Sequence, residues 1–414
     1  MRVLVLGGGV VGVTTAYQLQ RDGHDVVLVE RLPDVARDTS FGNAGMIAPG
    51  HSFVWSSPRA PWTLLKSLVL RDQALRFKPS ADPRLWRWSL QFLMQCTAAK
   101  ARANTLRKHQ IAVYSQGLLQ QTLADAQIAY DRNTNGILYF YRDPAALAAG
   151  IEHMRILAED GQCIEVLDRA QIVARDPSLA DAAEKLAGGI FCPTDETGDC
   201  AMFTRGLAEV CRARGVSLRT GVTAQAIEAS GDTVTGVRTD QGVLTADAYV
   251  LALGCQSPFL ARPLGVDLPI YPIKGYSLTI PIGNHCAPPA MAVLDEHNLV
   301  GISRFGERIR VTATAEFAGY DVTHRPADFA HMTRVVRELY PDGADYARAE
   351  MWAGLRPMTP DNLPIIGRKR HRNLWYNTGH GHIGWTMSHG SARITADLVA
   401  GRPPAISMDG LLAA

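Results

Sequence analysis

The chain has few cysteines for its 414 residues, and none of the seven forms a Cys-x-x-Cys pair. An odd number of cysteines without paired spacing argues against a disulfide framework, a zinc finger and an iron–sulfur cluster. We therefore expect reduced thiols, no bound metal and a cytoplasmic location.

Neither sign of charge is in excess, because 42 lysines and arginines face 40 acidic residues and the net charge is +2. The sequence also lacks a long block of like charge, so we expect no nucleic-acid partner. No apolar run approaches the ~20 residues of a membrane span, and Met1 directly precedes the first predicted strand. We expect neither a transmembrane helix nor a signal peptide. The 47% hydrophobic content is typical of a globular protein of two domains.

The first thirty residues hold the most informative pattern. An apolar strand is predicted at 2–6, and the turn Gly7-Gly-Gly-Val-Val-Gly12 leads from it into a helix at 13–21. In such a turn the first glycine makes the bend, the second lets the backbone approach a pyrophosphate, and the third lets helix pack on strand. Glu30 ends a second predicted strand, 26–29, where its carboxylate can bind ribose hydroxyls. The pattern predicts an adenine dinucleotide, and a purely structural glycine turn is the alternative.

A loop of small residues follows at 38–46. Ser40 and Asn43 can donate hydrogen bonds to the rest of a long dinucleotide, and Gly45 permits close approach. The alternative is a plain surface loop.

The segment 55–100 combines four tryptophans with lysines and arginines beside apolar residues. We interpret it as helices of a second domain, or as a surface that contacts a membrane or a lipid quinone, because tryptophan with basic residues is typical of membrane interfaces.

The C-terminal half returns to the dinucleotide domain after a long insertion. Residues 248–254 read as a buried parallel strand that ends in Gly254 beside a ligand, and 271–317 as antiparallel strands. Gly379-His-Gly-His-Ile-Gly384 precedes a helix but no second strand with an acidic end. It is therefore expected to direct a second helix N-terminus at the same cofactor, which favours FAD over NAD.

These patterns predict an α/β protein, α+β overall, in which a Rossmann-type FAD-binding domain is interrupted by a substrate domain with an antiparallel sheet flanked by helices. The predicted FAD-binding domain comprises 1–54, 187–262 and 346–414. The predicted substrate-binding domain comprises 55–186 and 263–345.

Arg356 is the candidate for positioning a substrate. A flavin enzyme needs little more from its protein than orientation and electrostatics, and a guanidinium can bind a carboxylate with two parallel hydrogen bonds. A structural ion pair is the alternative reading of this arginine.

Six motifs resemble the small subunit of bacterial D-amino acid dehydrogenases, within the wider family of FAD-dependent glycine, sarcosine and D-amino acid oxidases. The likeness extends over essentially the whole chain. The motifs are the Gly7–Gly12 turn, 39–45 (TSFGNAG), 195–200 (DETGDC), 271–280 (YPIKGYSLTI), 354–361 (GLRPMTPD) and 377–387 (NTGHGHIGWTM).

The resemblance implies oxidation of a D-amino acid to an imino acid, which hydrolyses to a 2-oxo acid and ammonia. Electrons would pass to a quinone or another acceptor, with a peripheral contact to the inner face of the membrane. An oxygen-using oxidase and a non-catalytic flavin subunit of a complex remain open, as does a homo- or hetero-oligomeric assembly.

By position, Arg356 matches the carboxylate-binding arginine of the family, and Met46 and His382 match the substrate side of its flavin. His297, Asn298 and His51 depart from the pattern, and a polar pocket of this kind could suit a cyclic substrate such as D-proline or cis-4-hydroxy-D-proline. The expected catalytic residues are Arg356, His382, Met46, Asn298, His51 and Tyr276. The expected FAD-binding residues are Gly7, Gly9, Val10, Val11, Gly12, Glu30, Arg31, Ser40, Asn43, Ala44, Gly45, Met46, Val222, Gly254, Gly381, His382, Ile383, Gly384, Trp385 and Thr386.

Overall fold

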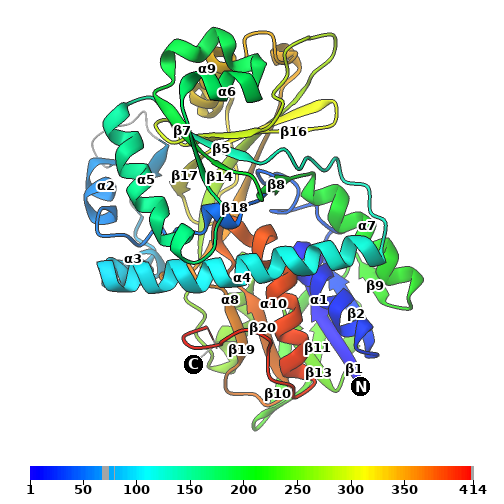
Figure 1. Ribbon diagram of the computed structural model, residues 1–414. Helices are drawn as coiled ribbons and strands as arrows, with labels where there is room; N and C mark the ends of the chain where they lie inside the picture. Colours follow the sequence, from blue (N-terminus) through cyan, green and yellow to red (C-terminus); the bar gives the residue numbers. More distant parts are fainter. Residues whose placement is uncertain (68–73, 79, 412–414) are drawn as a thin grey trace.

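The computed structural model describes residues 1–67, 74–78 and 80–411. Part of the tryptophan-rich segment, 68–73 and 79, lies outside the described residues. Two large sheets occupy opposite ends of the molecule, and the long helix α4 (Ala98–Asp125) crosses between them (Figure 1).

The first sheet has six strands in the order β19-β20-β13-β1-β2-β9. All neighbours are parallel except β19 and β20. The strands are β1 (Arg2–Leu6), β2 (Asp25–Glu30), β9 (Ser217–Thr220), β13 (Ala248–Leu251), β19 (Ile365–Arg368) and β20 (Leu374–Thr378). The central strands are apolar because both faces of this sheet are covered, as in other parallel sheets.

The side chains of β1 point alternately to the two faces of this sheet. Val3 and Val5 pack with the helices α1 (Val10–Arg21), α7 (Cys200–Ala213) and α10 (Gly384–Val399). Leu4 and Leu6 pack on the other face, against a three-stranded sheet. Its strands are β10 (Ala224–Ser230), β11 (Thr233–Thr239) and β12 (Gly242–Leu244).

The second large sheet has nine strands, eight of them in the order β18-β14-β17-β16-β15-β5-β7-β6, with β4 beside β17. It is antiparallel apart from the pairs β5–β15 and β4–β17. The strands are β4 (Leu75–Phe77), β5 (Ile137–Tyr141), β6 (Glu165–Leu167), β7 (Gly188–Cys192), β14 (Tyr271–Pro281), β15 (Ala292–Asp295), β16 (Val300–Phe305), β17 (Arg308–Phe317) and β18 (Glu350–Met358). The predicted fold class is confirmed. The predicted domain boundaries stay a prediction, and β7 and β18 join this sheet although they fall within the ranges assigned to the FAD-binding domain.

Several helices begin where the sequence supplies a cap. Asp82, Asp143 and Asp168 each accept a main-chain N–H in the first turn of the helix that follows, which satisfies a donor that the helix leaves free. These helices are α3 (Pro83–Gln95), α5 (Pro144–Glu159) and α6 (Arg169–Arg175). The remaining α-helices are α2 (Ala60–Ser67), α8 (Ser257–Ala261) and α9 (Ala330–Leu339), and β3 (Met46–Ile47) pairs with β8 (Glu196–Thr197).

Within the described part of the chain, no helix is both long and apolar enough to cross a membrane. The same residues contain no group of three or more His, Cys, Asp or Glu side chains that could hold a metal ion. All seven cysteines are free thiols.

Candidate functional site

A cavity of about 440 Å³ lies where the carboxyl ends of β1, β2, β13 and β20 meet strands β14 to β18. Its walls include the glycine turn after β1, the loop 36–46, and the residues around Arg356 and His382. The cavity therefore contacts both large sheets, and it lies at the edge of the parallel sheet where such folds bind ligands.

The glycine turn after β1 is built for close contacts. Gly7 has a φ of 117°, and a Cβ there would lie 2.5 Å from the carbonyl oxygen of Ala252. A Cβ on Gly12 would lie 1.9 Å from the carbonyl oxygen of Gly7, so only glycine lets α1 pack against the turn. Gly9 lines the cavity. A Cβ built on Gly9 would have Ser40 Oγ as its nearest neighbour, at 3.3 Å. The open side of the turn is thus free for a ligand.

The N-terminus of α1 lies at the same wall. Val10 and Val11 line the cavity, and Gly9 supplies no side-chain cap. The hydroxyl of Ser40 accepts a hydrogen bond from Val10 N at 3.0 Å, which leaves its own proton free to donate. A helix N-terminus of this kind favours anions such as phosphates.

Glu30 closes the cavity at the end of β2. Its two carboxylate oxygens accept hydrogen bonds from Gly8 N at 2.7 Å and Leu32 N at 2.8 Å. Each oxygen keeps a second lone pair, so the carboxylate can still accept from ribose hydroxyls. Glu30 therefore fixes the turn and remains able to bind an adenosine ribose.

A second helix N-terminus faces the cavity from the C-terminal end of the chain. The short helix η7 (Gly381–Ile383) runs directly into α10, and residues 379–385 line the cavity. Neither helix has a side-chain hydrogen bond at its N-terminal cap. The dipoles of α1 and α10 therefore favour negative charge in one shared cavity.

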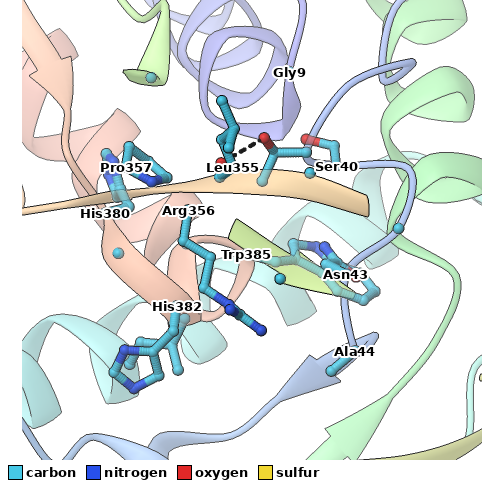
Figure 2. A pocket seen from close by; sticks show the side chains of 18 of the residues that line it. Gly9, Ser40, Asn43, Ala44, Leu355, Arg356, Pro357, His380, His382 and Trp385 are labelled. Carbon is cyan, nitrogen blue, oxygen red and sulfur yellow. Dashed lines mark hydrogen bonds between the residues drawn. The ribbon is translucent and has the colours of Figure 1, made fainter. Parts of the chain in front are cut away.

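Arg356 extends from β18 into this space, beside His382 and opposite the loop that holds Asn43 and Ala44 (Figure 2). Its guanidinium donates to the carbonyl oxygen of Thr314 at 3.0 Å. Among the described residues it has no ion pair, and burial lowers the pKa of Arg356 to about 10. A cation without an acidic partner, facing a cavity, is suited to bind a carboxylate.

Two imidazoles, His51 and His382, contact each other edge to face in the same cavity, with ring centroids 5.6 Å apart. His51 stacks on Tyr139 with ring centroids 5.7 Å apart, and His382 stacks on Trp55 at 4.9 Å. Burial and the charge of Lys108 lower the pKa of His51 to about 4 and hold that of His382 well below its ordinary value. Both rings are therefore neutral at neutral pH.

Lys108 lies behind these imidazoles. Its side chain is fully buried, and Nζ lies 3.2 Å from the carbonyl oxygen of Phe53 and 3.3 Å from Nε2 of His382. Burial lowers the pKa of Lys108 to about 7. The protonation of Lys108 thus decides whether His382 Nε2 accepts or donates in this contact.

Comparison with known proteins identifies the family. Residues 2–398 match the family designated DAO and described as FAD dependent oxidoreductases. The chain belongs to this family. The D-amino acid dehydrogenase 2 of Mesorhizobium japonicum is 45% identical over 413 residues, which cover 100% of this chain and 99% of that relative. The D-amino acid dehydrogenase of Paramagnetospirillum magneticum is 45% identical over 412 residues, 99% of this chain and 98% of that protein.

The fold of the DAO family also occurs in solved structures of lower identity. Glycine oxidase from Bacillus cereus superposes with a TM-score of 0.77 at 20% identity, covering 100% of this chain and 98% of that one. L-proline dehydrogenase from P. horikoshii superposes with a TM-score of 0.73 at 17% identity, covering 97% of this chain and 94% of that one. These likenesses concern the fold alone.

FAD is the cofactor of the DAO family, and the residues present here fit it. The bare backbone at Gly9, the two helix N-termini and the free lone pairs of Glu30 suit a dinucleotide that carries a pyrophosphate and a ribose. The predicted cofactor is therefore confirmed.

Most of the predicted site residues line the cavity. They are Gly7, Gly9, Val10, Val11, Glu30, Arg31, Ser40, Asn43, Ala44, Gly45, Met46, His51, Gly254, Tyr276, Arg356, Gly381, His382, Ile383, Gly384 and Trp385. Their individual roles in binding or catalysis stay predictions. Tyr276 is already engaged, because its hydroxyl donates to Glu316, and burial raises its pKa.

Four predicted residues lie outside the cavity lining. Gly12 packs under the turn, Val222 N donates to Glu30 O at 2.9 Å, and Thr386 Oγ1 accepts from Ala48 N at 3.1 Å. Each of these positions supports a neighbour that does line the cavity. Asn298 is the fourth: its amide donates to Asp295 Oδ2 at 2.7 Å within the turn after β15, and its predicted role stays a prediction.

The sequence reasoning missed two residues that the structure places at the site. Lys108 lies on the buried stripe of α4 with Thr105, Ala112 and Ser115, and a lysine at that helical spacing was the available signal. Glu296 lines the cavity directly after β15. No sequence signal distinguishes its carboxylate from that of Asp295 next to it.

Proposed function

We propose that this protein is a D-amino acid dehydrogenase, which oxidises its substrate to an imino acid that hydrolyses to a 2-oxo acid and ammonia. The relatives named above, each 45% identical over nearly the whole chain, support the substrate class. The redox step itself is the chemistry of the FAD isoalloxazine ring. The protein has to bind the substrate, orient its Cα–H and exclude water.

The main support for the proposal is the position of Arg356, which lines the cavity without an acidic partner among the described residues. Its planar fork can donate a hydrogen bond to each oxygen of the substrate carboxylate, and a single arginine held between β18 and Thr314 can fix the substrate in one orientation. Because Arg356 is already buried, its guanidinium has little further hydration to lose when a carboxylate binds.

The neutral imidazoles suit the other end of the amino acid group. With a pKa of about 4, the ring of His51 is uncharged and can accept a hydrogen bond from the substrate amine without repelling it. His51 has no side-chain hydrogen bond elsewhere in the described ranges, and it lines the cavity. Met46 and Trp55 add apolar surface to the same wall.

A screen under anaerobic conditions tests the proposal. Purified holoprotein is mixed with D-amino acids, their L-enantiomers and both enantiomers of proline, and bleaching of the flavin absorbance is followed. We expect rapid bleaching by D-substrates and little by L-substrates. Failure of every D-compound to reduce the flavin would reject the proposal and favour a non-catalytic flavin subunit. Exclusive use of D-proline and its derivatives would identify a cyclic substrate.

We also propose that a quinone at a membrane surface takes the electrons. Helix α3 buries Leu85, Trp88 and Phe92 in one cluster, yet its opposite face exposes large apolar side chains. These are Trp86, Leu90, Leu93 and Met94, with exposed fractions of 53%, 61%, 45% and 54%. A helix that is apolar on both faces is unusual at a protein surface in water, and tryptophan beside arginines is typical of a lipid interface.

Charge placed on this face tests the acceptor. The double variant Leu90→Glu/Leu93→Glu should lose most binding to anionic lipid vesicles and most activity with a vesicle-embedded quinone, while its activity with a water-soluble dye stays unchanged. Val243→Glu, an equally exposed position on β12, is the control that should change neither. Stoichiometric peroxide release in air at the dye rate would favour an oxidase instead.

A further inference from the structure

Glu296 is an acidic side chain in the substrate cavity to which the reaction described so far assigns no role. We propose that its carboxylate binds a hydrogen-bond donor, N–H or O–H, on the side chain of the substrate. The proposal rests on the function given above, because it concerns the substrate of that same site. It assigns the enzyme a preference for D-amino acids whose side chain carries an ammonium or a hydroxyl group.

The inference rests on the difference between the side-chain contacts of Glu296 and those of its neighbour Asp295. Asp295 is fully buried, and its carboxylate accepts from His297 N, Asn298 N, Asn298 Nδ2 and the guanidinium of Arg142. Glu296 has no hydrogen bond and no ion pair from its side chain anywhere in the ranges that the structure describes. Asp295 thus stabilises the turn, and Glu296 is left without a structural partner.

Glu296 is half-buried and lines the cavity, so a ligand there can reach it. A polar side chain without a protein partner keeps its full hydrogen-bonding capacity for such a ligand. Burial and the charge of Asp295 raise the pKa of Glu296 to about 7. Glu296 lines the cavity, so a donor on the substrate can supply a partner for its carboxylate.

The position of Glu296 separates its role from that of Arg356. Arg356 is on β18, and Glu296 directly follows β15. In the sheet order β18-β14-β17-β16-β15, strand β15 is the fourth strand after β18. Because neighbouring strands are spaced about 4.8 Å apart, Arg356 and Glu296 lie at well-separated points of the cavity wall. Burial alone lowers the pKa of Arg356, so the two charges do not neutralise each other. One end suits the substrate carboxylate, and the other suits a group at the far end of its side chain.

The wall between these ends carries no charge of its own. The lining residues there come from β16 and β17 and include Gly301, Thr312, Ala313 and Thr314. The acid of β17, Glu316, is paired with Lys78 at 2.9 Å and with the hydroxyl of Tyr276. Glu296 is therefore the carboxylate that remains available to a substrate in this part of the cavity.

Two matched pairs of substrates test the inference. D-lysine is compared with D-norleucine, and cis-4-hydroxy-D-proline with D-proline, by kcat/KM with a soluble dye. We expect the donor-bearing member of at least one pair to be preferred by roughly 10- to 100-fold, the value of a charge-assisted hydrogen bond. The pair that shows the preference identifies the donor as an ammonium or a hydroxyl group.

Variants of Glu296 connect the preference to this side chain. Glu296→Leu should reduce the preference to within about twofold of unity, and Glu296→Gln should keep part of a hydroxyl preference but lose an ammonium preference, since an amide oxygen still accepts but carries no charge. Flavin content and Tm of both variants report on folding. Glu307→Gln, at the exposed turn between β16 and β17, is the matched control and should keep the wild-type preference.

The outcomes separate this inference from the proposed function. If wild type oxidises D-norleucine and D-proline as well as their partners, or if a folded Glu296→Leu variant retains the wild-type preference, the role of Glu296 is rejected and the dehydrogenase stands. If none of the four D-compounds reduces the flavin, the dehydrogenase proposal itself is rejected.

Discussion

Replacing Arg356 by alanine is the most direct test of the substrate site. The guanidinium has one hydrogen-bond acceptor from the protein, Thr314 O, and no acidic partner in the described part of the chain. Its remaining donors face the cavity. Removing one partner of a desolvated charge pair costs about 2–5 kcal/mol. We therefore expect kcat/KM for a D-amino acid to fall by roughly 30- to 5,000-fold.

The lysine variant separates charge from geometry. Arg356→Lys keeps a cation but loses the planar fork, so the alignment of Cα–H with the flavin should suffer along with affinity. We expect kcat to fall as well as KM to rise, with an overall loss smaller than that of the alanine variant. Stopped-flow flavin reduction at saturating substrate measures the effect on kcat directly.

Stability and flavin content show whether Arg356 acts on the substrate or on the fold. Arg356 is an uncompensated cation in the absence of substrate, so Arg356→Ala should leave Tm unchanged or raise it, and FAD content should stay near wild type. Arg310 is the matched control, because its buried guanidinium donates to Phe41 O at 3.0 Å and Asn43 O at 2.8 Å. Arg310→Ala should lower both Tm and FAD retention by releasing the 38–46 loop.

Two results would refute this reasoning about Arg356. A folded, flavin-replete Arg356→Ala protein with kcat/KM within about threefold of wild type would reject the carboxylate contact, since that loss is under ~1 kcal/mol. Loss of FAD from the variant would instead assign Arg356 to cofactor binding.

The remaining predictions concern the cofactor and Lys108. Acid precipitation should release FAD into the supernatant, and flavin left on the pellet would contradict a non-covalent site. Glu30→Gln should lower the FAD occupancy, which is measured by absorbance after gel filtration. Lys108 has a folded pKa of about 7, below its ordinary 10.5, so the unfolded chain binds more protons between these values and stability should rise with pH there. Lys108→Met should remove that rise from Tm measured between pH 7 and 10, and an unchanged slope would show that the folded pKa of Lys108 is not lowered.

The cofactor half of the site could be predicted because its information is local. The strand at 2–6, the turn Gly7–Gly12 and the helix after it follow from side-chain volume and glycine conformation within about twenty residues. Glu30 lies at the end of the next parallel strand, which pairs with β1 in register. Such a βαβ unit places its parts without information from the rest of the chain.

The substrate-binding residues of the site could be predicted only where they belong to a recognisable sequence motif. Arg356 was proposed from its chemistry and matched by the resemblance, and His382 was identified through the resemblance. The structure brings both into one site with Lys108 and Glu296, although no spacing in the sequence relates them. Asn298 was expected at the site because it departs from the family pattern, and its role there stays a prediction. In the turn after β15 the amide of Asn298 donates to the carboxylate of Asp295, a pairing that no spacing in the sequence predicts.

The sequence by itself determined the dinucleotide turn, the alternation of parallel and antiparallel strands, and the family. Tertiary structure alone decided which polar groups lack partners. The unpaired carboxylate of Glu296, the free cation face of Arg356 and the buried amine of Lys108 depend on what the nine-stranded sheet and α4 place around them. Burial and hydrogen bonding are properties of the surroundings in space, and Lys108 and His382, which are in contact here, are 274 positions apart in the chain.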